Sequence, residues 1–238
     1  MTDAELARAI AEEAGVLLLR IQEEGADGAR GDREANILIL DRLRAARPED
    51  AILSEESADD PIRLTHSRVW IIDPLDGTRE FAENRADWAV HVALAVDGVA
   101  AAGAVALPRL GVTLGTDVPP VLAGGRVPPR MLVSRSRASA LCSNVGEKIG
   151  AEHIAMGSAG AKAMAVVRGE AEIYLHTGGQ HQWDNCAPVA VALAAGLHCS
   201  RIDGSEIIYN QPGTSLPDLL ICRPEWSQTV LESVANCS

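Results

Sequence analysis

The sequence predicts an α/β protein whose N-terminal part is α+β and whose C-terminal part alternates strand and helix. Two amphipathic helical segments come first, followed by two short apolar runs that end in acids. An Asp-Gly pair then interrupts the apolar stretch 88–116, which predicts an antiparallel hairpin. Beyond the loop 117–130, strand-like and helix-like segments alternate. We therefore expect an N-terminal α+β domain over residues 1–127 and a C-terminal α/β domain over residues 128–238.

The first two segments have the spacing of amphipathic helices. Thr2 and Glu5 have the spacing of a capping box, and Gly25 ends the first helix. The apolar residues between them recur on one helical face, namely Leu6, Ile10, Leu17 and Ile21. A Gly- and Ala-rich loop then leads to Asp32, and the apolar spacing after it predicts a second helix that stops before Pro48.

Strands are expected next. The segments 51–56 and 69–73 are apolar runs that end in acids, and loops that leave buried strands often carry functional groups. The hairpin turns at its Asp-Gly pair, and segment 111–116 predicts a further strand. The loop 117–130 holds two Pro-Pro pairs and two adjacent glycines, so a domain boundary belongs there.

Strand and helix alternate in the remainder of the chain. Strands are expected at 131–134, 153–156, 172–176, 197–201 and 218–223. Helices are expected at 136–149, 159–168 and 185–195. A closing helix is expected to begin at Pro224, because proline suits the first turn of a helix.

Composition excludes several classes of partner. The formal net charge of −12, without a basic run to offset it, argues against nucleic acid and anionic membrane. The five cysteines include no C-x-x-C pair, which is typical of reduced thiols rather than of disulfides or a zinc site. No signal peptide is evident, and His91 and the Asp-Gly pair interrupt the longest apolar tract, so we expect a cytoplasmic protein without a membrane span. Whether it forms a homodimer stays open.

The segment from Val69 to Thr78 carries the clearest chemical signal. Large apolar residues lead directly to Asp73 and Asp76, while the proline and glycine of Asp-Pro-Leu-Asp-Gly-Thr allow a tight turn. Such a turn can aim both carboxylates at one point, where they repel each other. A hard divalent cation such as Mg²⁺ prefers oxygen ligands and removes the repulsion.

Other acids could complete a metal site. Glu55 and Glu56 end the preceding strand, and Asp184 begins a later helix. An alternative needs no metal, because Asp-Pro-Leu-Asp-Gly-Thr can be an ordinary turn, Asp184 a helix N-cap and the two glutamates a solvated loop. Spacing alone leaves both interpretations open.

The order of these motifs resembles the inositol monophosphatase superfamily, whose members are lithium-sensitive, Mg²⁺-dependent phosphatases. The resemblance covers most of the chain and rests on four motifs in order: Ser54-Glu55-Glu56-Ser57, then 70–78, then Gly157-Ser158 before a helix, then Trp183-Asp184 at the start of another. It implies a layered αβαβα sandwich of the inositol monophosphatase and fructose-1,6-bisphosphatase type. It also implies inhibition by lithium.

The resemblance implies two or three Mg²⁺ ions and their ligands. It assigns Glu55, Asp73 and the Leu75 carbonyl to one ion. It assigns Asp73, Asp76 and Asp184 to a second, and Glu55 also lies near a third, weaker ion. Two such ions, about 3.5 to 4 Å apart, can clamp a phosphoryl group and lower the pKa of a bound water.

The resemblance also implies which residues activate the attacking water. In this family Thr78 pairs with an acid located before the second helix, which here is Asp32, and Glu55 is a further catalytic residue. The surrounding Gly-Ala-Arg-Gly-Asp-Arg-Glu lacks the threonine that commonly precedes this acid. The segment that precedes Asp32 thus departs from the family pattern.

For the substrate, the N–H groups of the glycine-rich segment 157–162 and Lys162 could receive phosphate oxygens. Taken alone, a Gly-Ser helix start and a surface lysine are common. Lys162 and the Ser-Arg-Ser stretch around Arg135 are similar to the bacterial CysQ-type phosphatases of adenosine 3′,5′-bisphosphate (PAP). The resemblance therefore implies removal of the 3′-phosphate of PAP, or of its sulfated relative PAPS, in sulfur assimilation. The implied substrate contacts are Gly77, Thr78, Arg135, Ser158, Lys162 and Asp184, with Arg137 adding charge.

Two other functions stay open. The substrate could instead be inositol monophosphate or a sugar bisphosphate. The chain could also be a non-catalytic, metal-binding regulatory protein that keeps the fold. His181 and Trp183 precede or adjoin Asp184 and could line the adenine side of the pocket, although a solvated histidine and a core tryptophan are the simpler interpretation.

Overall fold

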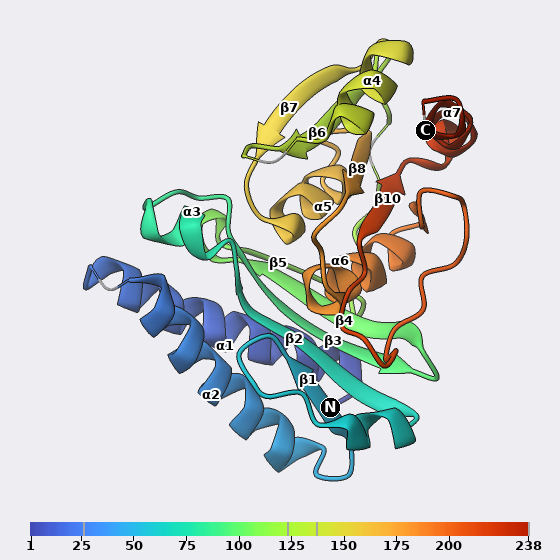
Figure 1. Cartoon of the computed structure of the whole chain (residues 1–238). Coiled ribbons are helices and arrows are strands. Elements are labelled where there is room, and N and C mark those ends of the chain that lie inside the picture. The colour runs from blue at the N-terminus through green and yellow to red at the C-terminus, as the bar shows by residue number, and fades with distance from the viewer. Residues whose placement is uncertain (26, 123, 137, 238) are drawn as a thin grey trace.

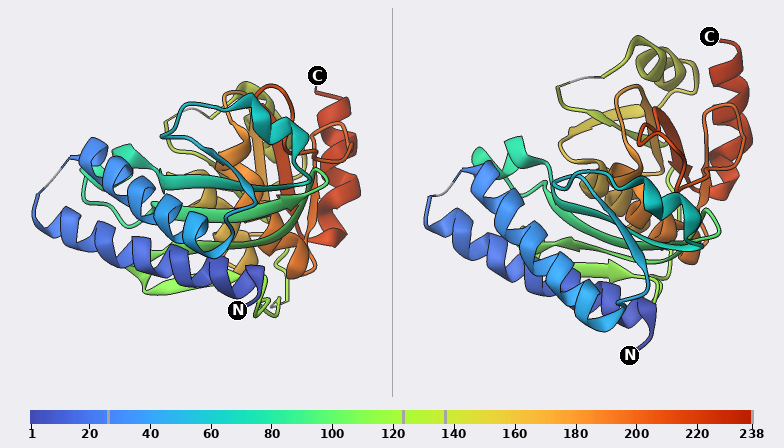
Figure 2. Two further views of the ribbon diagram at one scale, coloured as in Figure 1. Left: turned by 90° about the horizontal axis from the view of Figure 1, so that it is seen from below. Right: turned by 60° about the horizontal axis from the view of Figure 1, so that its bottom comes forward.

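Helices and sheets alternate in five layers in the computed structural model, which describes residues 1–25, 27–122, 124–136 and 138–237 (Figures 1 and 2). Helices α1 and α2 cover the outer face of one sheet, and α5 and α6 lie between the two sheets. Helices α4 and α7 cover the outer face of the second sheet. The expected αβαβα sandwich is confirmed.

The first sheet brings two acids to one edge. Its strands follow the order β1-β2-β3-β4-β5, with β1 parallel to β2 and the other pairs antiparallel. Its strands are β1 Ala51–Ser54, β2 Arg68–Asp76, β3 Ala89–Val96, β4 Val99–Leu107 and β5 Val112–Gly115. Ser54 pairs with Ile72, so the next residues, Glu55 just after β1 and Asp73 within β2, lie side by side.

The second sheet lies in the C-terminal half. Its order is β7-β6-β8-β10-β9, with β6 parallel to β7 and β8, and β10 antiparallel to both of its neighbours. Its strands are β6 Arg130–Ser134, β7 Glu152–Met156, β8 Ile173–Thr177, β9 His198–Ser200 and β10 Asp218–Cys222. Each expected C-terminal strand is thus present to within a few residues.

The helices agree with most of the expected positions. They are α1 Asp3–Glu23, α2 Gly28–Ala46, α3 Thr78–Ala82, α4 Ala140–Lys148, α5 Ala159–Val167, α6 Gln182–Ala194 and α7 Pro224–Ala235. Two 3₁₀ helices are also present, η1 Pro61–Thr65 and η2 Pro108–Leu110. The capping box is confirmed, with Thr2 N donating to Glu5 Oε2 at 2.7 Å and Glu5 N to Thr2 Oγ1 at 3.2 Å.

Some boundaries differ from the prediction for local reasons. Helix α2 begins at Gly28 rather than after Asp32, because the Asp27 side chain caps it by accepting from Arg30 N at 3.0 Å. Helix α4 begins late, where Ser139 caps it, and α6 begins early, at Gln182. The short α3 and η1 carry too few apolar residues to show helical periodicity.

Three apolar clusters fill the spaces between the layers. One lies between α1, α2 and the first sheet, and one lies between the second sheet, α4 and α7. The largest lies between the sheets around α5 and α6 and contains residues of both halves, such as Val105 and Leu219. The division into domains at 127/128 stays a prediction. No helix in the described part of the chain is long and apolar enough to cross a membrane.

Core packing under α1 is open to a direct test. Leu18 is 0% exposed in the cluster between α1 and the first sheet, so Leu18→Ala should lower the free energy of unfolding by about 2 to 5 kcal/mol. Val16 lies two residues away on the same helix and is 69% exposed, so Val16→Ala is the matched control and should change it by less than about 0.5 kcal/mol. Equal decreases in the free energy of unfolding for the two variants, measured by denaturant titration, would contradict this packing.

Candidate active site

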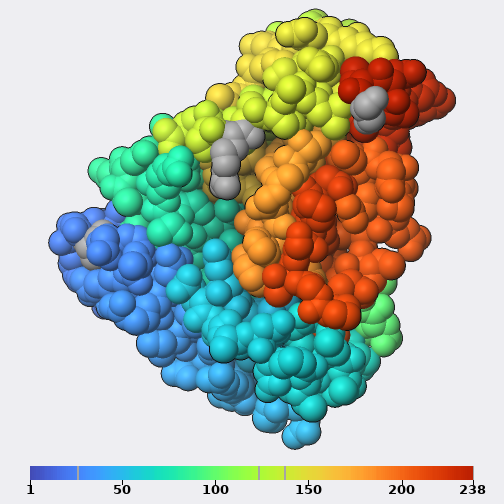
Figure 3. All heavy atoms as spheres, viewed as in Figure 1, coloured from blue at the N-terminus to red at the C-terminus, as the bar shows by residue number. Residues whose placement is uncertain are grey.

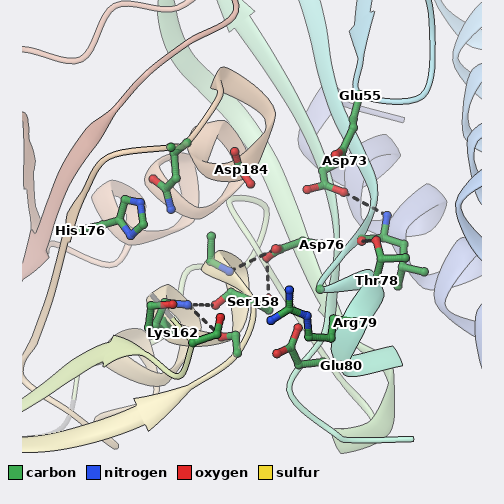
Figure 4. Close-up of a pocket in the computed structure, with 18 of the residues that line it drawn as sticks. Glu55, Asp73, Asp76, Thr78, Arg79, Glu80, Ser158, Lys162, His176 and Asp184 are labelled. Atoms are coloured by element: carbon green, nitrogen blue, oxygen red, sulfur yellow. Dashed lines mark hydrogen bonds between the residues drawn. The ribbon is translucent and has the colours of Figure 1, made fainter. Parts of the chain in front are cut away.

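A pocket of about 270 Å³ lies where the two halves of the chain meet (Figure 4). In the space-filling view the N-terminal half, blue to green, meets the C-terminal half, yellow to red, on one face (Figure 3). The polar side chains that line the pocket come from both halves and include Glu55, Asp73, Asp76, Thr78, Lys162 and Asp184. Segments more than 100 residues apart in the sequence therefore form one acidic site.

The end of β2 positions the first pair of acids. The strand register with β3 shifts between Asp73 and Asp76, so the two residues between them form an irregularity at the strand end. The Asp73 carboxylate accepts from Leu75 N at 3.1 Å within this turn. Gly77 follows with φ 94°, a left-handed conformation that favours glycine, and α3 starts at once.

Asp76 is held by the beginning of α5. Its carboxylate accepts from Ser158 Oγ at 2.5 Å, Gly160 N at 2.6 Å and Ala159 N at 3.2 Å. His91 Nε2, fully buried on β3, lies 3.3 Å from Asp76 Oδ2. The N–H groups at the start of α5 were expected to bind substrate phosphate. Two of them instead donate to a protein carboxylate.

Asp184 completes a cluster of three acids. It lies in the first turn of α6, where His181 N donates to its Oδ2 at 2.6 Å. One ligand atom each from Asp73, Asp76 and Asp184 lies within 4.8 Å of the others. Glu55 lines the same pocket but does not belong to this cluster.

The four acids differ in how their charge is compensated. Burial, and then the charges of Glu55 and Asp76, hold the pKa of Asp73 well above its usual range. Burial also raises the pKa of Glu55 to about 7 and, with the charge of Asp76, that of Asp184 to about 6. For Asp76 burial is outweighed by His91 and the α5 donors, and its pKa falls to about 2. The site therefore carries carboxylates that favour a cation.

The donor set fits Mg²⁺. Asp73 and Asp76 are buried with oxygens near those of Asp184, and hard divalent cations take carboxylate and carbonyl oxygens as ligands. Leu75, whose carbonyl was expected to be a ligand, lines the pocket. A cation here would neutralise the charge that raises the pKa of Asp73 and Asp184. The roles assigned to single ligands stay predictions.

Thr78 and Asp32 meet beside the acids. Thr78 Oγ1 lies 3.2 Å from Asp32 Oδ2 and 3.3 Å from the Leu75 carbonyl oxygen. Burial, and then the charge of Glu56, raise the pKa of Asp32 to about 7. Asp32 Oδ1 is buried without a hydrogen-bond partner among the described residues. A Cβ at Gly28 would lie 2.2 Å from Thr78 Cγ2, so this glycine lets α2 approach Thr78.

The residues expected to bind substrate are only partly free to do so. Lys162 and Ser158 line the pocket, but the Lys162 ammonium donates to the Gly157 carbonyl at 2.9 Å and Ser158 binds Asp76. Arg135 is ion-paired with Glu80 rather than turned to the pocket lining. Gly77 lies in the lining, whereas Arg137 lies outside the described residues.

His91 and Arg79 are among the residues at the site that were not predicted. His91 Nδ1 lies 3.0 Å from the Trp183 carbonyl oxygen, so this histidine connects Asp76 with the start of α6. In the sequence, His91 is the single polar residue of the strand Ala-Val-His-Val-Ala, and a polar residue inside a buried strand could have indicated a functional role. Arg79 lines the pocket, and in the sequence it is the basic residue directly after Thr78.

His181 and Trp183 stack on each other, with ring centroids 4.7 Å apart.

Comparison with known proteins agrees with this geometry. The sequence model of the inositol monophosphatase family matches residues 7–118 and 130–237. A 3′-phosphoadenosine 5′-phosphate phosphatase of Mycobacterium leprae is 50% identical over 97% of this chain and 93% of its own length. The chain belongs to the inositol monophosphatase family. The resemblance seen in the sequence is thereby confirmed.

Other members of the family are more distant. The 3′(2′),5′-bisphosphate nucleotidase CysQ of Escherichia coli is 30% identical over 75% of this chain and 77% of its own length. The crystal structure of inositol monophosphatase II from Staphylococcus aureus superposes with a TM-score of 0.80 at 18% identity, over 97% of this chain and 94% of that one. This structural similarity shows that the fold is that of the family.

Mg²⁺ should raise the melting temperature of the protein, and more at about pH 8 than at about pH 5. The pKa of the Asp184 carboxyl is about 4 in the unfolded chain and about 6 in the folded protein. The metal-free fold therefore loses stability as the pH rises from the first pKa through the second, because the folded protein must then hold a charge that the unfolded chain exposes to water. A bound cation offsets that loss. Asp184→Asn should therefore melt higher than wild type at pH 8 without metal and respond less to Mg²⁺.

The control for this measurement is Asp41→Asn, an exposed acid on α2 outside the pocket. Its melting curves should follow those of wild type with and without Mg²⁺ at both pH values. A full Mg²⁺ response in Asp184→Asn would show that the cation binds elsewhere.

Proposed function

We propose that the protein is a Mg²⁺-dependent phosphatase that removes the 3′-phosphate of PAP, or of PAPS, and releases inorganic phosphate. The observation that carries this proposal is the meeting of Asp73, Asp76 and Asp184 in one pocket, beside the Thr78–Asp32 contact. This arrangement supplies an oxygen-rich cation site next to a group that can take a proton from water. Metal-assisted hydrolysis of a phosphate ester uses both.

The choice of PAP rests on the relatives. The Mycobacterium leprae protein named as a 3′-phosphoadenosine 5′-phosphate phosphatase is similar over nearly the whole of both chains, and the E. coli nucleotidase is named for bisphosphates. The proposed role in sulfur assimilation rests on the same similarity.

The chain's own residues supply positioning and proton transfer. Thr78 and Asp32 hold a water at the edge of the acid cluster, and Asp32, with its unpaired Oδ1, accepts a proton from it. The water oxygen forms a bond to phosphorus as the bond to the 3′-oxygen breaks, and the 3′-oxygen takes a proton from solvent. Bound Mg²⁺ would supply charge neutralisation of the phosphoryl oxygens and a lower pKa for the water. Glu55, which lines the pocket with Asp73, is proposed as a further residue that would help to hold the cation.

A substrate panel tests the proposal. With Mg²⁺ present, kcat/KM for PAP should exceed that for inositol 1-phosphate and for fructose 1,6-bisphosphate. Asp32→Asn should lower kcat about 10²- to 10⁴-fold, the usual size of a general-base contribution, while Asp41→Asn should not. A higher kcat/KM for inositol 1-phosphate or fructose 1,6-bisphosphate would show that PAP is not the preferred substrate. Absence of turnover with all three compounds would favour a regulatory, metal-binding protein.

Lithium provides a separate test of the three-acid cluster. Li⁺ is close to Mg²⁺ in size but carries half the charge, so it should compete for the carboxylates without stabilising the leaving oxygen to the same degree. At fixed Mg²⁺ and fixed ionic strength, replacing Na⁺ by Li⁺ should lower turnover of PAP. Since both salts screen charge equally, identical rates up to tens of millimolar, roughly where screening begins to matter, would argue against such a site.

A further inference from the structure

A substrate with two phosphates needs a second contact for anions besides the acid cluster and its cation. The following inference therefore rests on the proposed function. Three lysine or arginine side chains lie at or next to the pocket in the described part of the chain, namely Arg79, Arg135 and Lys162. Their contacts decide which of them can bind a phosphate.

Lys162 is already committed to the backbone. Its side chain is 4% exposed, and its ammonium donates to the carbonyl oxygens of Gly157 at 2.9 Å and Ser158 at 2.5 Å. An ammonium has three N–H bonds, so two of the three are used. Lys162 thus stabilises the turn that presents Ser158 to Asp76, and a phosphate would have to compete with both carbonyls.

Arg135 is committed to two acids. Its guanidinium Nη2 lies 2.7 Å from Glu80 Oε1 and 2.9 Å from Glu83 Oε2. Both acids belong to α3 or its C-cap, so the ion pairs connect the second sheet's β6 end to the first sheet's α3. A phosphate bound by Arg135 would lie beside these carboxylates, which would repel it.

Arg79 differs from both. It is exposed, lines the pocket and follows Thr78 in the first turn of α3. Within the residues that the structure describes, its guanidinium has no hydrogen bond or ion pair, because the adjacent Glu80 binds Arg135 instead. Figure 4 shows Arg79 turned into the pocket on the side of Ser158 and away from Glu55 and Asp73.

We propose that Arg79 binds the phosphate that is not removed and so gives the enzyme a preference for bisphosphates over monophosphates. A guanidinium offers paired N–H donors that match two phosphate oxygens, and it stays charged at every relevant pH. In Figure 4, Asp73 and Asp184 lie on one side of Asp76 and Arg79 lies on the other. The neighbouring Glu80 is paired with Arg135. A nucleotide with two phosphates can contact both sides, whereas a monophosphate leaves Arg79 without a partner.

The test compares PAP with 3′-AMP, which has the same scissile 3′-phosphate but lacks the 5′-phosphate. Wild type should prefer PAP in kcat/KM. Arg79→Gln should lower kcat/KM for PAP about 10- to 100-fold, the range expected for a charged hydrogen-bonded contact, chiefly through KM. For 3′-AMP the loss should stay below about threefold. Arg79→Lys, which keeps the charge, should restore part of the preference.

The matched control is Arg109→Gln, because Arg109 is exposed on η2 and does not line the pocket. It should leave both specificity constants unchanged. Equal losses for PAP and 3′-AMP in Arg79→Gln would assign Arg79 to the scissile phosphate and overturn the inference, as would an unchanged preference for PAP. If wild type hydrolyses PAP, either of these results contradicts only the role of Arg79 and leaves the proposed phosphatase function intact. If wild type hydrolyses no bisphosphate, the proposed function and the role of Arg79 are both contradicted.

Discussion

The carboxylate of Asp76 connects the two halves of this protein, and the site depends on that connection. It leaves the first sheet at the end of β2 and accepts three hydrogen bonds from Ser158, Ala159 and Gly160 at the start of α5. Hydrogen bonds to a charged group contribute about 1.5 to 3 kcal/mol each, and the helix N-terminus adds a favourable field. His91 extends the connection to α6 through the Trp183 carbonyl oxygen, so one buried acid helps to place Asp184.

The remaining acids of the site receive fewer hydrogen bonds than Asp76 does. Protein donors lower the pKa of Asp76, whereas the pKa values of Asp32, Glu55, Asp73 and Asp184 are all raised. Several buried carboxylates close together lower the stability of the metal-free protein, more so in a chain of net charge −12. Their proximity therefore indicates a functional role. A bound cation would offset the repulsion between these acids, and the same cation would reverse the local sign of the charge for an anionic substrate.

The sequence was informative where the physics is local or where a motif is long. Caps, apolar runs and turn residues predicted most strands and helices, and the segment 69–78 predicted an acidic site at a strand end. The start of α2 was missed because Asp27 and Asp32 are both acceptable caps by composition, and in the structure Asp27 is the one that accepts from a backbone N–H of the first turn. The Asp76 partner of Ser158 was not predictable, since it depends on how α5 meets β2. The partners of Lys162 are carbonyls of its own segment, but the spacing alone also allowed a lysine directed to substrate.

The small residues of the inner layer explain how acids from distant segments come so close. A Cβ at Gly160 would lie 2.0 Å from His91 Nε2, and one at Gly103 would lie 3.2 Å from Ala190 Cβ and 3.3 Å from Ala187 Cα. Close approach of α5 and α6 to the first sheet therefore requires glycine and alanine at these contacts. A larger side chain at Gly160 could not be accommodated without a shift of His91 or of α5, and both contribute to the position of Asp76. The low aromatic content, 3% of the chain, is thus consistent with the close spacing that the acid cluster requires.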